Sequence, residues 1–502
     1  MTASAHLKSN RRQWFQTICR TSSIPGGRRQ LFGVIFRTSS IPGGRRQLFG
    51  VIFRTSYILG GRRQLFGVIF RTFYILGGRR FLLGHCPMDA PVRTRRKDNE
   101  WCVQLVNRAG QLLATCLFIA FYSAKVFAES KLLPDEVQIH GFLTQGFFHT
   151  SDNNVYGQSD DGISPGLTEI GLNMSYQPWD RLRFAAQGLY RRAGEVDTGS
   201  VRLDYGLADL TLFDYDSGKI GIRGGRIKIP FGLYNETRDV AFTHPTILLP
   251  QGIYFDRSRS LLLSADGGSF YAEQRTSFGD FNFKFNVGLS PNDLDEIKTV
   301  VLGKRSARGN FDTKPAIATQ LNYELNGGEY VFAISYMDLE FDFNPALGEP
   351  LRKSTTHIQP LLFSAQYNGE KFTLTGEYEY RWNSFGNFAP FGGGKFVSES
   401  WYVEGSYRIL PSLQATVRYD TFYVDASDKS GNGAAALGFP RHVAFAQDWV
   451  FGLRWDITPS WMVRADYSRV HGTAWLPQAD NPDTQKDIQD WDLYGLQLSF
   501  KF

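Results

Sequence analysis

The strongest constraint on the fold of this chain is a hydrophobic period of two that recurs from residue 137 to the last residue. In the final stretch, "DLYGLQLSFKF", apolar residues from Tyr494 to Phe502 alternate with Gly, Gln, Ser and Lys. The stretches "FNFKFNVGLS" and "DWVFGLRWDI" repeat the pattern. Such alternation is typical of a β-strand with one apolar and one polar face. We therefore expect this region to be all-β.

The connections between these strands favour one all-β architecture. Candidate strands begin near residues 137, 168, 182, 201, 219, 267, 281, 314, 330, 354, 371, 395, 413, 442, 461 and 487. Tight links such as "QPWDR", "FGD", "NGGE", "NGEK", "LPS" and "TPS" alternate with long polar ones such as "VDASDKSGNGAAALGFPR". Short turns at one rim and long loops at the other are typical of bacterial outer-membrane barrels, whereas a β-sandwich gives no reason for them. The sequence therefore predicts a sixteen-stranded antiparallel transmembrane β-barrel.

The last strand is expected to pair with the first, near "VQIHGFLTQGFF". An open sheet edge in lipid would leave backbone groups unpaired, and each such group is costly. Phe502, with Phe500 two residues before it, resembles the C-terminal signature by which barrel-assembly machinery recognises Gram-negative outer-membrane proteins. That resemblance implies a location in the bacterial outer membrane. It also implies contact with the assembly machinery, outer-membrane lipid and lipopolysaccharide.

The two ends of the chain differ in charge. Residues 1 to 128 hold 21 of the 55 Lys and Arg residues but 3 of the 49 Asp and Glu residues. The rest of the chain, with 34 basic and 46 acidic residues, has a formal charge near −12. A nucleic-acid binder is not expected to have this balance. All four cysteines lie before residue 129, which excludes cysteine chemistry from the remainder.

The first part of the chain contains a repeat of 17 residues. "RTSSIPGGRRQLFGVIF" begins at Arg20 and again at Arg37, and near copies follow at Arg54 and Arg71. One interpretation is a solenoid or a basic membrane-binding arm. Near-identical copies instead favour duplicated DNA ahead of the true start. We therefore expect that residues 1–87 do not belong to the mature protein.

A second start at Met88 is followed by features of an export signal. A basic leader precedes the apolar run "QLLATCLFIAFYSA", and Val126 and Ala128 fit the small-residue rule for cleavage. Residues 88–128 are therefore predicted to be a signal peptide, and 129–502 the barrel domain. A retained membrane anchor is the alternative.

A barrel of sixteen strands is too wide for side chains to fill, so water is expected in its lumen. The longest irregular stretch, Pro230 to Arg259, follows the fifth strand. It could span the lumen at roughly 3.3 Å per residue. In this placement the chain resembles sixteen-stranded porins, and "GGRIKIPFGLYNETRDVAF" resembles phosphate-selective porins of the O/P type. The resemblance implies an inward-folded third loop, a homotrimer, and Glu236, Arg238 and Asp239 as constriction residues.

Charged residues also occur opposite the apolar faces of the strands, where the alternation turns them toward the lumen. The pore-lining candidates are Arg183, Arg191, Arg202, Asp204, Glu377, Glu379, Glu404, Arg418, Asp420, Arg454, Asp456, Arg464 and Asp466. Opposite charges side by side in a lumen tune which ions pass. Alternatively, these pairs brace the wall by neutralising each other.

We expect a passive porin for small hydrophilic solutes or ions. The alternative is a closed barrel that acts as an adhesin, a receptor or a structural protein through its long loops. The histidines after residue 128 lack metal-ligand spacing, and the chain has no nucleophile-elbow or HExxH motif. Neither an enzyme nor a cofactor or metal is expected.

Overall fold

The computed structural model describes residues 134–291, 308–386 and 393–502, together with seven short strands between residues 21 and 76. The chain divides into two compact units, Met1–Glu129 and Ser130–Phe502. The predicted signal peptide, residues 88–128, lies outside the described residues.

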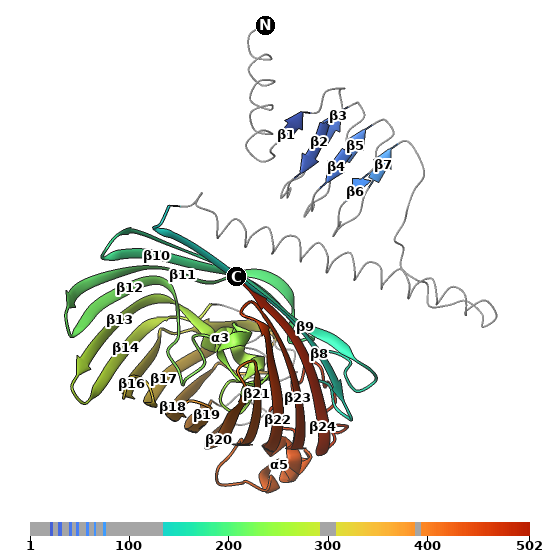
Figure 1. The fold of residues 1–502 in the computed structure, drawn as a ribbon. Helices are drawn as coiled ribbons and strands as arrows, with labels where there is room; N and C mark the ends of the chain where they lie inside the picture. Colours follow the sequence, from blue (N-terminus) through green and yellow to red (C-terminus); the bar gives the residue numbers. More distant parts are fainter. Residues whose placement is uncertain are drawn as a thin grey trace. The chain divides into compact units, whose positions relative to one another are not determined.

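The second unit is a closed antiparallel barrel, which confirms the predicted fold class (Figure 1). Its wall strands are β8 (Val137–Thr150), β9 (Ser164–Trp179), β10 (Leu182–Ala193), β11 (Asp197–Tyr215), β12 (Gly218–Lys228), β13 (Ser264–Thr276), β14 (Gly279–Leu289), β16 (Ala316–Leu325), β17 (Tyr330–Pro345), β18 (Ser354–Asn368), β19 (Phe372–Phe385), β20 (Gly394–Leu410), β21 (Leu413–Tyr423), β22 (Phe445–Thr458), β23 (Trp461–Gly472) and β24 (Asp490–Lys501). The short strand β15 (Gly309–Thr313) pairs with the end of β17, while β14 pairs directly with β16. The wall therefore has the predicted sixteen strands.

The connections alternate in length, as the sequence predicts, with one exception. Tight turns join β9 to β10, β11 to β12, β13 to β14, β16 to β17, β18 to β19, β20 to β21 and β22 to β23. The exception is the link between β10 and β11, which is short although it lies at the long-loop rim. The long connections at the other rim contain the short helices η1 (Ala241–Thr243), η2 (Asp256–Ser258), α3 (Arg259–Leu263), α5 (Asn432–Ala436) and η3 (Arg441–Ala444). Across the described part of the chain, no helix has the length and hydropathy needed to cross a bilayer.

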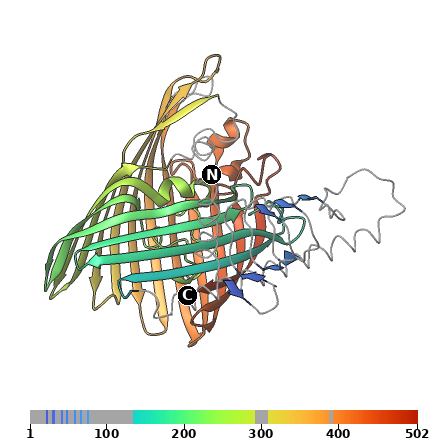
Figure 2. The ribbon, with the colours of Figure 1, turned by 90° about the horizontal axis from the view of Figure 1, so that it is seen from above.

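The barrel closes where β24 pairs with β8, as predicted, and Figure 2 shows the strands side by side around the wall. The register runs from Leu493 opposite Thr150 to Lys501 opposite Phe142. Phe502 continues it by two backbone hydrogen bonds with Gly141, of 3.0 and 3.2 Å. A Cβ atom at Gly141 would lie 2.5 Å from the Phe502 ring, so the last aromatic packs directly against this glycine.

The two faces of the wall are opposite to those of a water-soluble protein. On β19, the apolar residues Phe372, Leu374 and Trp382 are about 40% exposed, whereas Glu377 and Glu379 on the other face are buried. On β22, five alternate residues from Trp449 to Ile457 are 45–51% exposed. The period of two thus places the apolar side chains on the outside and the charges inside.

The first unit contains two small sheets, one of β1 (Thr21–Ser23), β2 (Arg29–Phe32), β4 (Gln47–Phe49) and β6 (Leu65–Phe66), and one of β3 (Ser40–Pro42), β5 (Tyr57–Leu59) and β7 (Tyr74–Leu76). Equivalent residues of successive repeats pair in parallel, as Leu31 with Leu48 and Leu48 with Leu65. These short strands therefore pair in register. This does not bear on where translation starts, so the assignment of residues 1–87 stays a prediction.

Candidate functional site

Residues 229–263, between β12 and β13, contact the interior face of the wall; we call them the interior segment. The segment turns at Gly232, whose φ of 58° and close approach to Tyr254 and Glu377 favour glycine. The Gly232 N–H donates to Ser335 of β17 at 3.1 Å, and Gln320 of β16 donates to the Gly232 carbonyl at 2.9 Å. Backbone groups of the segment are thus held by wall side chains.

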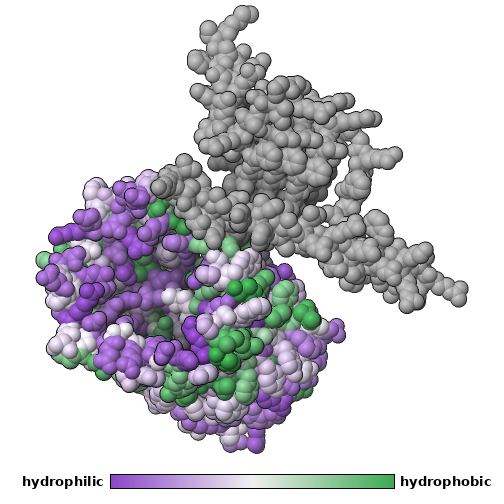
Figure 3. Space-filling view, in the orientation of Figure 1, coloured by the Kyte–Doolittle hydropathy of each residue, from purple (hydrophilic) through white to green (hydrophobic). Residues whose placement is uncertain are grey.

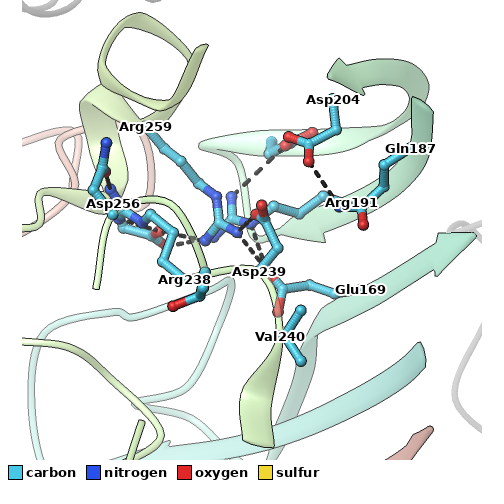
Figure 4. A network of polar contacts seen from close by, with 12 residues as sticks. Glu169, Gln187, Arg191, Asp204, Arg238, Asp239, Val240, Asp256 and Arg259 are labelled. Atoms are coloured by element: carbon cyan, nitrogen blue, oxygen red, sulfur yellow. Dashed lines mark hydrogen bonds and ion pairs between the residues drawn. The ribbon is translucent and has the colours of Figure 1, made fainter. Parts of the chain in front are cut away.

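A network of charges, which we call the charge cluster, binds the segment to β9–β12 (Figure 4). Arg191 of β10 donates to Glu169 of β9 at 3.0 Å and to Asp256 of the segment at 2.5 Å. Its members are four cations and four carboxylates: Lys228, Arg191, Arg238, Arg259, Glu169, Asp204, Asp239 and Asp256. Arg191 also lies 3.7 Å from Asp197, whose carboxylate pairs with Arg202, so the cluster is formally neutral with or without this adjoining pair.

The two segment carboxylates of the charge cluster each accept from several cations. Asp239 pairs with Lys228 and with Arg259, and Lys228 also donates to Asp204 at 2.8 Å. Arg259 and Arg238 approach Asp256 at 3.4 and 3.5 Å. Such pairing is required because an uncompensated charge in a buried site costs several kcal/mol.

These neighbours decide the ionisation of the segment residues. Burial alone would raise the pKa of Asp239, but Lys228 and Arg259 hold that pKa well below its usual range. Burial opposes ionisation of Asp256 in the same way, and its three arginine neighbours hold its pKa low. Burial and the adjacent Arg259 lower the pKa of Arg238 to about 10, so Arg238 is still charged at neutral pH.

On the opposite side of the barrel, the carboxylate of Glu377 holds the segment through hydrogen bonds, with no cation at ion-pair distance from it among the described residues. Glu377 of β19 accepts hydrogen bonds from the Leu233 N–H at 3.0 Å and from the Tyr254 hydroxyl at 2.7 Å. Ser364 and Tyr402 of the neighbouring strands donate to the same carboxylate at 2.6 and 2.9 Å. Glu377 therefore joins both ends of the segment to β18–β20.

The middle of the segment is held by β21–β23. Arg418 donates to the Leu248 carbonyl at 3.0 Å, and Asp466 accepts from the Ile247 N–H at 2.5 Å. Arg464 donates to the carbonyls of His244 and Thr246 at 2.8 and 2.7 Å. Wall side chains from opposite sides of the barrel thus bind one segment.

His244 is a neutral member of this contact. Burial, and then the positive charge of Arg464, hold the pKa of His244 well below its usual range. Arg454 also faces it and donates to the Phe242 carbonyl at 3.1 Å. A proton on this imidazole would be repelled by three arginines, Arg464, Arg259 and Arg454.

A different arrangement occurs on β10–β14, where interior charges stay partly exposed; we call these side chains the open wall. Arg223 pairs with Asp209 at 2.9 Å, with side chains 25% and 17% exposed. Lys284 pairs with Glu236 of the segment at 2.6 Å, with side chains 19% and 30% exposed. Arg183 is exposed as well. Figure 3 shows a hollow in the barrel with hydrophilic surface around it.

The predicted site residues therefore fall into groups with different surroundings. Of the three constriction candidates, Arg238 and Asp239 are buried in the charge cluster, and Glu236 is partly exposed. The pore-lining candidates that are buried are Arg191, Asp204, Glu377, Glu379, Glu404, Arg418, Asp420 and Arg464. Those that retain exposure are Arg183, Arg202, Arg454, Asp456 and Asp466.

Several members of the site are not among the predicted residues. Lys284 lies opposite Phe283 and Phe285, so the alternation in "FNFKFNVGLS" could have identified it. Asp209 and Arg223 are opposite each other on paired strands and follow the same rule. Asp256 and Arg259 lie in an irregular stretch, where no period places a side chain.

The site has no arrangement suited to a metal ion. Within the described ranges, no group of three or more His, Cys, Asp or Glu residues could hold one. The carboxylates of the charge cluster already accept from arginine and lysine.

Comparisons with known proteins give likenesses in fold only. No protein-family model matches the chain, and no curated protein is similar to it in sequence. Among solved structures, it is similar to an anion-selective porin from Comamonas acidovorans, with a TM-score of 0.48, 12% identity, and coverage of 73% of this chain and 99% of that one. It is also similar to the outer membrane channel DcaP of Acinetobacter baumannii, with a TM-score of 0.46, 13% identity, and coverage of 73% and 97%. A third similar structure is that of OprB of Pseudomonas putida, with a TM-score of 0.46, 11% identity, and coverage of 73% of this chain and 94% of that one.

Proposed function

We propose that this protein is a passive porin that admits small hydrophilic solutes or ions across the outer membrane of a Gram-negative bacterium. The exposed apolar residues on the outer face support the membrane location, because such a surface is unfavourable in water and matches lipid. The closed sheet supports it too, since no strand edge is left unpaired in the bilayer.

One observation carries the proposal of a channel. The interior segment crosses between opposite walls and narrows the interior, while the open wall keeps charged side chains exposed beside it. A water-filled path needs such a polar lining. We assign Glu236 to the edge of that path, and Arg238 and Asp239 to the attachment of the segment.

The open wall supports weak ion selectivity. Arg183, Arg223 and Lys284 supply positive charge, and Asp209 and Glu236 supply negative charge close to two of them. A strictly phosphate-selective lumen would need a more uniformly basic lining. The resemblance to porins of the O/P type therefore stays a prediction.

The test is conductance of the full-length protein in a planar bilayer, with the reversal potential read under a salt gradient. Stable open steps with a small reversal potential are expected. A folded barrel that gives no steps would contradict the proposal and would favour a closed barrel that acts through its loops.

Several further properties remain predictions. These are the homotrimer, recognition of Phe502 by the assembly machinery, contact with lipopolysaccharide and export by the signal peptide. A mass-spectrometric peptide that begins at Glu129 would support the predicted cleavage, and a peptide from the 17-residue repeats would contradict the assignment of residues 1–87.

A further inference from the structure

A cavity of about 430 Å³ lies between the interior segment and the long-loop rim of β17–β21. Its volume falls within the range of roughly 300–1,000 Å³ that is usual for ligand pockets. Most of its lining is apolar, including Phe231, Phe255, Phe385, Phe422 and Leu476. The loops that follow β21 and β23 complete it.

Two arginines project into this apolar lining. The guanidinium of Arg257 lies 4.9 Å from the centroid of the Phe255 ring, and that of Arg381 lies 4.8 Å from it. Contacts of this kind hold a guanidinium flat against an aromatic ring and leave its N–H groups available at the edge.

The charges of the two arginines are compensated differently. Arg381 pairs with Glu379 at 2.6 Å and donates to the Gly252 carbonyl at 2.9 Å. Within residues 134–291, 308–386 and 393–502, no carboxylate lies at ion-pair distance from Arg257. Asp487, the other acid of the lining, already has an interaction of its own.

Arg257 therefore supplies one uncompensated positive charge. Burial and the nearby Arg381 lower the pKa of Arg257 to about 10, so the charge persists at neutral pH. A partly buried cation without a partner is unfavourable. An anion with an apolar body would compensate the charge with its anionic group and fill the apolar cavity with its body, so that no water need remain there.

We propose that this cavity binds an organic monocarboxylate with an aromatic or aliphatic body, whose carboxylate meets Arg257 and whose body lies among the apolar side chains. A bare hydrophilic anion fits less well, because the apolar lining cannot replace its hydration. The inference goes beyond the proposed function, since binding does not require that the barrel conduct.

The test is calorimetric titration of the full-length protein, in a neutral detergent, with three probes. 2-Naphthoate carries both the charge and the apolar body, 2-naphthylmethanol carries only the body, and inorganic phosphate carries only charge. We expect 2-naphthoate to bind at least about tenfold more tightly than either of the others, as one charge-assisted hydrogen bond implies.

Variants separate the cation from the cavity. Arg257→Gln should weaken 2-naphthoate binding at least about tenfold and leave 2-naphthylmethanol unchanged, whereas Arg257→Lys should retain most of the affinity. Arg469→Gln removes the same charge from a residue of β23 that does not line the cavity, and it should have no effect. All proteins are measured in the same detergent, so partition of a probe into micelles affects each titration equally and does not change the comparison between variants.

Three results would overturn the inference: equal binding of the acid and the alcohol, phosphate binding as tight as that of 2-naphthoate, or no binding of 2-naphthoate. If Arg257→Gln does not fold, the inference can still be tested by the Arg257→Lys variant and by comparing the binding of 2-naphthoate with that of 2-naphthylmethanol. A barrel that binds 2-naphthoate but gives no conductance would uphold this inference and contradict the porin proposal.

Discussion

The charge cluster and the open wall use the same kinds of side chain on adjoining strands, but in different surroundings. In the cluster, Arg191 is 2% exposed and touches carboxylates from both the wall and the segment. On the open wall, Arg223 has one carboxylate partner and a quarter of its side chain exposed. The difference is whether the interior segment covers the residue.

This comparison separates two roles of interior charge. Where the segment covers the wall, each charge needs compensation and the pairs fix the backbone of the segment. Where water reaches the wall, pairing contributes little to stability, and under the proposed function the same charges would act on passing ions. Substitutions in the two regions should therefore change different measured quantities.

The largest effect is expected from Asp256→Ala. It removes the carboxylate that Arg191, Arg238 and Arg259 share in a buried site, and breaking a buried ion pair costs roughly 3–5 kcal/mol. Denaturant unfolding from lipid vesicles should show this loss, and bilayer recordings should show a larger, noisier conductance as the segment detaches.

The matched control is Glu236→Gln, which removes a carboxylate from the same segment at its partly exposed side. Its unfolding free energy should change by less than about 1 kcal/mol. Similar losses for both variants would contradict the division into two regions.

A smaller loss is expected from Glu377→Gln, at the carboxylate that holds the segment through hydrogen bonds alone. The carboxylate accepts hydrogen bonds from the Leu233 N–H and from the hydroxyls of Tyr254 and Tyr402. The amide of glutamine has the same shape, but its NH₂ group is itself a donor and cannot accept these bonds. Hydrogen bonds to a charged group contribute about 1.5–3 kcal/mol, so a loss of about 2 kcal/mol should appear in the same unfolding measurement. An unchanged stability would show that the segment does not depend on this carboxylate.

Acidification should weaken the attachment through His244. Because its pKa is lowered in the folded state, the unfolded state binds more protons below about pH 6.5. The unfolding free energy should therefore fall between pH 7.5 and 5, by at most about 1.4 kcal/mol per pH unit. His244→Gln should make this dependence flatter.

The two segment carboxylates of the charge cluster, Asp239 and Asp256, also lose their contribution on acidification, but at a lower pH. The pKa values of Asp239 and Asp256 lie below their usual range, so their contribution is full above about pH 4 and is lost only as the pH falls through the lowered values. A steep loss between pH 6 and 5 in the His244→Gln protein would contradict this.

Lys284→Glu on the open wall is expected to change the unfolding free energy least and the ion selectivity most clearly. Reversing one charge near a water-filled path changes the free energy of a passing ion by on the order of 1 kcal/mol at low salt and less at high salt. The reversal potential should shift toward cation selectivity, with unfolding stability little changed. Lys486→Glu, at an 83% exposed loop side chain, is the control and should shift neither.

The sequence predicted the wall well because the lipid-facing and interior-facing residues alternate with a fixed period. It placed Trp449 and Trp455 outside, and Glu377 and Arg418 inside, without any knowledge of long-range contacts. The tight turns and the pairing of the last strand with the first followed from the same pattern.

The course of the interior segment could not be predicted in the same way. No period governs residues 229–263, so nothing in the sequence shows that Arg238 and Asp239 would be buried beside Arg191. Likewise, alternation shows that Glu377 points inward, but not that Tyr254 covers it. Exposure of an interior charge depends on contacts between residues that are distant in the chain.

The attachment of one segment to strands as distant as β10, β19 and β23 has a mechanical consequence. A ring of strands alone can flatten under lateral pressure from the bilayer, because its hydrogen bonds run only between neighbours. A cross-member bound to opposite sides resists that flattening, so pressure on one side of the ring is carried to the other. The attachment thereby opposes changes in the cross-section of the barrel, and with it in the width of any path through it.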